Sequence, residues 1–119
     1  IITRMEGRTP VPEREKIRSL AAHQSTMVLF LSTGLLEGLQ RELMAGGYAP
    51  NTPAAIVYKA TWPEQRVFRC TVDTLAKTAA DNRVTKTALI LVGRFLGDRY
   101  ERSKLYDPTF TTEFREAEK

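Results

Sequence analysis

The 119-residue sequence predicts an α/β domain in which a mixed β-sheet is flanked by helices. Three observations support this fold class. Short apolar runs of strand length alternate with segments whose apolar residues recur at helical spacing. Glycine, proline and polar turn residues separate these segments. The resulting order, β-α-β-α-β-β-α-β, favours an α/β layer that contains one antiparallel hairpin. A chain of this length suits a single domain with one core.

The N-terminal part of the chain is predicted to contain one strand and one helix. Residues 1–4 begin with β-branched side chains and no initiator methionine, which indicates a fragment that starts within a strand; a processed mature chain is the alternative. Residues 6–12 form a loop, because Gly7 frees the backbone and two prolines restrict it. A helix is expected from Pro12 to about Ala22. Its apolar face consists of Ile17, Leu20 and Ala21.

A second strand and a second helix are predicted next. Residues 26–31 form an uninterrupted apolar run, which predicts a strand buried on both faces. A helix is expected over residues 35–44, and Gly46 with Gly47 ends it. Leucines are expected to line one face of this helix, namely Leu35, Leu36, Leu39 and Leu43.

The second half of the chain is predicted to add three strands and a helix. Residues 53–58 indicate a buried strand, and residues 60–63 turn the chain. Residues 65–71 predict an antiparallel partner strand with one wetter face. A helix over residues 73–81 and a last central strand over residues 87–92 complete the sheet.

The final segment, residues 98–119, is polar and has no strong periodicity. Three of its apolar side chains, Leu105, Tyr106 and Phe110, are expected to pack back onto the domain. We therefore assign it to the same domain as residues 1–97.

Charge and cysteine content restrict the possible functions. The net charge is +4, so an anionic partner is a reasonable hypothesis. Lysines and arginines are scattered among carboxylates, yet a small basic nucleic-acid-binding module stays open as an alternative. The sequence has a single cysteine, Cys70, so an internal disulfide is ruled out, and this content fits a reducing compartment such as the cytoplasm. Cys70 itself is expected to be a buried, inert thiol. The longest apolar run, Met27–Leu31, is too short to span a membrane.

Five segments, taken in order and at their intervals, resemble one family. They are Thr3–Pro12, Thr26–Ser32, Pro53–Pro63, Thr87–Gly93 and Ser103–Phe110. Together they are similar to the C-terminal domain of the tetrapyrrole methylases. The Tyr-Lys-Ala-Thr-Trp-Pro run at 58–63 and the segment Ser103–Phe110 are typical of the branch that methylates C-11 of precorrin-4 or cobalt-precorrin-4.

This resemblance implies a function for the longer protein. Residues 1–119 would be the C-terminal domain of a cytoplasmic, homodimeric methyltransferase of cobalamin biosynthesis, without its N-terminal domain. S-adenosyl-L-methionine would bind between the two domains and leave as S-adenosyl-L-homocysteine. The substrate would be a tetrapyrrole, with neither nucleic acid nor membrane as a partner. The isolated fragment is expected to be inactive. A methyltransferase of the same family that acts on another ring position is the alternative within the family.

The resemblance also implies site residues. The cofactor would contact a set of strand-end positions, namely Leu31, Ala60, Thr87, Ala88 and Leu89. The carboxylate arms of the substrate call for cationic side chains, preferably arginine. Four are candidates, with the first two favoured: Arg8, Lys59, Arg4 and Arg66.

Each of these assignments has a plainer alternative. Leu31 and Leu89 also suit a hydrophobic core, and the four cations also suit a solvated surface. Methyl transfer from a sulfonium needs alignment and a dry cleft more than an acid, a base or a metal. The sequence therefore identifies no catalytic residue, and we expect no metal site.

Overall fold

The computed structural model describes residues 1–7, 9–30 and 33–97. Within these residues the α-helices and β-strands follow the predicted order. They are β1 (Ile2–Arg4), α1 (Ile17–Ala21), β2 (Met27–Phe30), α2 (Leu36–Gly46), β3 (Pro53–Tyr58), β4 (Arg66–Thr71), α3 (Leu75–Asp81) and β5 (Ala88–Val92). Short 3₁₀ turns accompany them: η1 (Glu13–Glu15), η2 (Thr33–Leu35), η3 (Val72–Thr74) and η4 (Arg94–Leu96). The predictions for Arg8, Leu31 and residues 98–119 lie outside the described residues.

The strands form one mixed sheet in the order β1-β2-β5-β3-β4. Strands β1 and β2 are parallel, whereas β5 is antiparallel to both of its neighbours and β3 pairs with β4 as the predicted hairpin. The last of the described strands, β5, therefore lies in the middle of the sheet. The α/β class and the mixed sheet expected from the sequence are confirmed.

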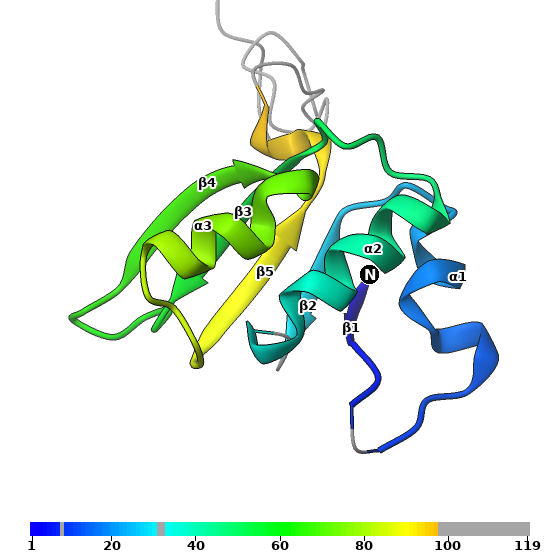
Figure 1. Cartoon of the computed structure of the whole chain (residues 1–119), viewed down its shortest axis with the longest axis horizontal. Helices are drawn as coiled ribbons and strands as arrows, with labels where there is room; N and C mark the ends of the chain where they lie inside the picture. Colours follow the sequence, from blue (N-terminus) through cyan, green and yellow to red (C-terminus); the bar gives the residue numbers. More distant parts are fainter. Residues whose placement is uncertain (8, 31–32, 98–119) are drawn as a thin grey trace, which may run out of the picture.

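The hydrophobic core lies between the sheet and the helices. Figure 1 shows α2 and α3 in front of the strands, on one side of the sheet, with α1 beside α2. Alternate residues of the strands point to that side, because successive side chains of a strand face opposite ways. Large, fully buried side chains of the core are Met27, Leu29, Leu39, Leu43, Ile56, Val72, Leu75, Ile90 and Val92.

Three expectations about these elements are corrected. Strand β2 is not buried on both faces: Val28 is half-buried and Phe30 is 44% exposed, because the described helices cover one side of the sheet. Leu35 is exposed, since it belongs to the 3₁₀ turn before α2. The first helix is shorter than predicted, because Lys16 adopts an extended conformation and separates η1 from α1.

Helices α1 and α2 approach each other closely at a glycine. A Cβ atom on Gly46 would lie 2.5 Å from the carbonyl oxygen of Arg18 and 2.6 Å from Cβ of Ala21. Gly47 follows with a φ of 127°, a conformation that favours glycine, and its N–H is directed at the carbonyls of Leu43 and Met44. The two glycines that the sequence predicts as a helix end therefore have different roles.

The substitution Gly46→Ala should destabilise the domain. The clash with a backbone carbonyl costs about 1–3 kcal/mol, and it exceeds the gain of up to about 1 kcal/mol that alanine brings within a helix. Urea titrations of both proteins measure the difference. Gly34→Ala is the matched control, because nothing lies within 4 Å of the added carbon. Equal stability of Gly46→Ala and the unaltered chain would contradict the close approach.

Candidate functional site

A pocket opens at the edge of the sheet where β2 and β3 end and β5 begins. Strands β2 and β3 run in the same direction, because both are antiparallel to β5, so their carboxyl ends meet at this edge. Ligands of open α/β sheets bind beyond such strand ends. The pocket has a volume of about 500 Å³. It is lined by Phe30, Gly34, Val57, Lys59, Ala60, Trp62, Thr85, Lys86, Thr87, Ala88 and Leu89.

The backbone at this pocket adopts an unusual conformation. Lys59, Thr61 and Thr87 have φ values of 47°, 72° and 60°, in the left-handed region that side chains other than glycine rarely adopt. Each costs about 1–3 kcal/mol and persists only where surrounding contacts enforce it. The Lys59 N–H donates to the Thr87 carbonyl at 2.8 Å, which ties the two segments together. The Thr61 N–H donates to Oε1 of Gln65 at 2.7 Å.

The charged side chains that line the pocket are both lysines, Lys59 and Lys86. The Nζ atom of Lys59 lies 5.3 Å from the centroid of the Tyr58 ring and 5.2 Å from that of the Trp62 ring. These cation–π contacts hold the ammonium group, and none of the described residues that line the pocket is a carboxylate. The pocket therefore combines positive charge with apolar and aromatic walls, which suits an anionic ligand that has a flat apolar body.

The structure brings most of the predicted site residues into this pocket. Four proposed cofactor positions and one proposed substrate cation line it: Ala60, Thr87, Ala88, Leu89 and Lys59. Leu89 is half-buried. Lys86 was missed by the sequence reasoning, although its place directly before the Thr87 segment was a usable signal.

Arg4 and Arg66 lie at the same edge of the sheet but do not line the pocket. Arg4 ends β1, and its Nη1 donates to the Thr9 carbonyl at 3.2 Å. Arg66 begins β4 opposite Tyr58, and its guanidinium lies 5.7 Å from the Phe68 ring centroid. The edge thus carries cations from both outer strands on either side of the pocket.

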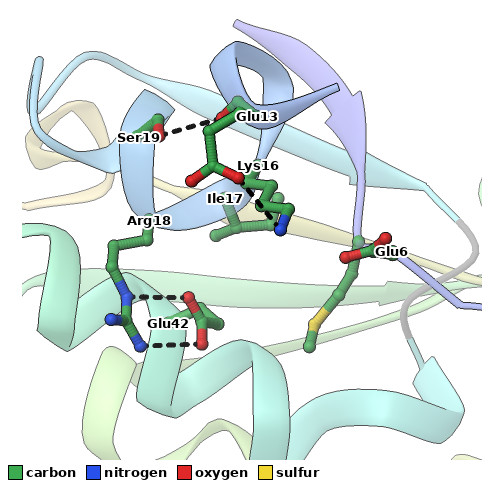
Figure 2. A pocket seen from close by; sticks show the side chains of 8 residues that line it. Glu6, Glu13, Lys16, Ile17, Arg18, Ser19 and Glu42 are labelled. Atoms are coloured by element: carbon green, nitrogen blue, oxygen red, sulfur yellow. Dashed lines mark hydrogen bonds and ion pairs between the residues drawn. The ribbon is translucent and has the colours of Figure 1, made fainter. Parts of the chain in front are cut away.

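A second pocket, of about 360 Å³, lies between the loop after β1 and helices α1 and α2 (Figure 2). Each of its two cations is paired with a carboxylate. Lys16 contacts Glu13 at 3.1 Å, and Arg18 donates to both carboxylate oxygens of Glu42 at 3.0 and 3.1 Å. The hydrogen bond and charge of Glu13 raise the pKa of Lys16. The Arg18–Glu42 pair links α1 to α2, and neither cation of this pocket is left without a carboxylate for a ligand to replace.

The described residues contain no group of three histidine, cysteine, aspartate or glutamate side chains placed to hold a metal ion. None of their helices is long and apolar enough to cross a membrane.

Cys70 lies on β4 with its side chain against the core, and it is half-buried rather than fully buried. Burial raises the pKa of the thiol; hydrogen bonds with Thr78 and Thr74 lower it in part, and the charge of Asp73 adds to the rise. The thiolate fraction at neutral pH is therefore smaller than for a free cysteine.

Cys70 should react slowly with a disulfide reagent in the folded protein. A raised pKa lowers the thiolate fraction at pH 8, so we expect a rate at least about threefold below that of the urea-unfolded chain. The rate should climb as the pH rises above the ordinary pKa of a cysteine thiol, because the pKa of Cys70 is raised. Absorbance of the released thiolate measures both rates. Equal rates in the folded and unfolded chains at pH 8 would contradict the assignment.

Comparison with known proteins identifies the family. The sequence profile of the tetrapyrrole (corrin/porphyrin) methylases matches residues 1–76, well over half of the chain. The chain therefore belongs to the tetrapyrrole methylase family.

Two relatives illustrate the match. The cobalt-precorrin-4 C(11)-methyltransferase of Methanocaldococcus jannaschii is 47% identical over 120 residues, which cover 100% of this chain and 46% of that protein. The precorrin-4 C(11)-methyltransferase of Mycobacterium tuberculosis is 38% identical over 99 residues, which cover 82% of this chain and 39% of that protein. The chain thus spans about half the length, or less, of these curated relatives.

Solved structures agree with this assignment. The X-ray structure of a cobalamin biosynthetic enzyme, cobalt precorrin-4 methyltransferase, superimposes with a TM-score of 0.79 at 45% identity, over 82% of this chain and 41% of that chain. A uroporphyrin-III C-methyl transferase from Thermus thermophilus, complexed with S-adenyl homocysteine, gives a TM-score of 0.62 at 20% identity, over 85% of this chain and 42% of that chain. The latter likeness shows the fold alone.

Proposed function

We propose that this chain is the C-terminal half of an S-adenosyl-L-methionine-dependent methyltransferase that acts on C-11 of cobalt-precorrin-4 in cobalamin biosynthesis. The 47% identity to such an enzyme across the whole chain carries the proposal. The pocket at the ends of β2 and β3 supports it, because four of the positions implied for the cofactor line that single pocket. The missing N-terminal domain would supply the other wall of the cleft, and the isolated fragment would be inactive.

The pocket fits the adenosine part of the cofactor. Ala60 and Ala88 are small and leave room for a ring, while Val57 and Leu89 offer apolar walls. The tie between Lys59 and Thr87 fixes the backbone on both sides of this space. Leu31 is also proposed as a cofactor contact. Bound S-adenosyl-L-methionine supplies an electrophilic methyl group, and this half of the protein orients the bound molecule and excludes water.

The cations along the same edge fit the substrate. A tetrapyrrole of this pathway is a flat ring with several carboxylate arms, and carboxylates pair with ammonium and guanidinium groups. Lys59 faces the pocket directly, and Arg4 and Arg66 flank it. Arg8 is proposed for the same task. The four residues would hold the arms while the ring carbon reaches the methyl group.

The cobalt form of the substrate is favoured over the metal-free form. The identity is 47% to an enzyme named for cobalt-precorrin-4 and 38% to one named for precorrin-4. Incubation of the full-length protein with either substrate and ¹³C-methyl-labelled cofactor tests this proposal. Carbon NMR should show one new methyl group at C-11, formed faster on the cobalt-containing ring. Methylation at another ring position would instead support the alternative within the family.

The longer protein is further proposed to be a cytoplasmic homodimer. The family assignment and the single, unpaired cysteine support this placement. Sedimentation of the full-length protein tests the dimer, and fractionation of cells tests the compartment.

Enlarging Ala60 should weaken cofactor binding in the full-length protein. A leucine at this position fills part of the pocket that we assign to adenosine, so the dissociation constant for S-adenosyl-L-homocysteine should rise at least about tenfold, which corresponds to about 1.4 kcal/mol. Isothermal calorimetry measures it. Ala22→Leu, on an exposed residue at the end of α1, is the control. Unchanged affinity of Ala60→Leu would remove Ala60 from the cofactor site.

Replacing Lys59 with glutamine should impair substrate binding more than cofactor binding. Loss of a charged hydrogen bond costs about 1.5–3 kcal/mol, which corresponds to a rise in KM for the tetrapyrrole of about tenfold to 150-fold. Steady-state kinetics with each substrate varied in turn measures the effect. Lys77→Gln serves as the control, because Lys77 pairs with Asp81 on the outside of α3. A rise confined to the KM for the cofactor would contradict the assignment.

A further inference from the structure

The segment that joins β3 to β4 forms two successive turns (Figure 1). In the first turn, the Trp62 N–H donates to the Lys59 carbonyl at 3.0 Å. In the second, the Gln65 N–H donates to the Trp62 carbonyl, also at 3.0 Å. We call the first of these, residues 59–62, the pocket turn.

The pocket turn contains a threonine where glycine is usual. Thr61 is the third residue of this turn and has a φ of 72°. A positive φ at that position is typical of type II turns, which take glycine or asparagine there. A β-branched residue in this region is an outlier, and it persists only where surrounding contacts enforce it. The conformation of Thr61 therefore requires a contact that holds it.

The side chain of Gln65 provides such a contact. The Thr61 N–H donates to Oε1 of Gln65 at 2.7 Å, and the oxygen is the atom of a side-chain amide that can accept this bond. Pro63 is the second residue of the second turn, where its fixed φ is favoured. The pairing of Tyr58 with Arg66 anchors both ends of the segment to the sheet. The backbone of Gln65 is therefore held in place while its side chain reaches Thr61.

The pocket turn also sets the positions of groups that line the strand-end pocket, namely Lys59, Ala60 and Trp62. The Nζ atom of Lys59 lies 5.2 Å from the Trp62 ring centroid, so the first and last residues of the turn are in contact. Thr61 lies between them, and a rotation of its backbone would displace Trp62 relative to Lys59. The conformation of Thr61 thus governs how the ammonium group and the small Ala60 side chain face the pocket.

We infer that Gln65 is a positioning residue, whose side-chain oxygen holds the pocket turn in the shape that binds the cofactor and a carboxylate arm of the tetrapyrrole. Gln65 is not among the described residues that line the pocket, so it acts through the turn. This inference rests on the proposed function, because that proposal supplies the two ligands.

The variant Gln65→Met in the full-length protein tests the inference, because methionine has a similar length and lacks the carbonyl oxygen. The dissociation constant for S-adenosyl-L-homocysteine and the KM for the tetrapyrrole should each rise about three- to tenfold, the worth of one hydrogen bond. The variant Gln65→Glu keeps an oxygen acceptor. Its affinity for S-adenosyl-L-homocysteine should therefore be close to that of the unaltered protein.

The matched control is Gln40→Met. Oε1 of Gln40 accepts a hydrogen bond from the Ala76 N–H at 3.1 Å and links α2 to α3. This variant loses the same kind of bond at a residue that is not among those described as lining the pocket. It should lower stability without a change in either binding constant. A merely structural role for Gln65 predicts this same result for Gln65→Met.

A measurement without ligand separates this inference from the proposed function. Trp62 is the only tryptophan of the 119-residue sequence, so its fluorescence reports on the pocket turn of this chain. Its anisotropy should fall in Gln65→Met, because the turn loosens, and should stay unchanged in Gln40→Met.

Failure of the unaltered full-length protein to bind either ligand would remove the proposed function, and the anisotropy would then decide the role of Gln65. A fall in anisotropy would support that role, and an unchanged anisotropy in Gln65→Met would overturn it. In a protein that does bind, unchanged binding constants in Gln65→Met, or equal losses of cofactor affinity in Gln65→Met and Gln65→Glu, would overturn it as well.

Discussion

The position of β5 between β2 and β3 is the constraint on which the rest of the structure depends. This strand is the last of the described strands, yet it supplies the central pairings of the sheet, with Leu29 opposite Ile90 on one side and Ile56 opposite Ile90 on the other. Within the sheet, the two halves of the domain are therefore joined through β5. Loss of β5 would separate the β1–β2 pair from the β3–β4 hairpin and open the core.

The same pairing creates the candidate site. Because β5 is antiparallel to β3, the first residues of β5 lie beside the turn that follows β3, and the Lys59 N–H meets the Thr87 carbonyl. The left-handed conformations of Lys59, Thr61 and Thr87 are held by this arrangement. The pairing of the strands offsets the free-energy cost of these three conformations. The backbone at the strand ends is therefore already fixed without a ligand.

Charge distinguishes this surface from the pocket between α1 and α2. Between α1 and α2, each cation faces a carboxylate, as in the Arg18–Glu42 pair, and the result is a link between helices. At the strand ends, Lys59 contacts aromatic rings, and Lys86 lines the same pocket, whose described lining residues include no carboxylate. Positive charge that is not neutralised internally is available to an anionic ligand, and for this reason we propose that the substrate arms bind at the strand ends.

Much of this could be predicted from the sequence, because periodicities of 2 and 3.6 residues are local properties. The sequence alone predicted the order of elements and the β3–β4 hairpin. Through the family resemblance, it also grouped Ala60 with the Thr87 segment. The sequence could not show which side of the sheet the helices cover, that Leu35 is exposed, or that Lys86 joins Lys59 in one pocket. Only the tertiary structure decided these points, since they depend on the pairing of strands that lie far apart in the sequence.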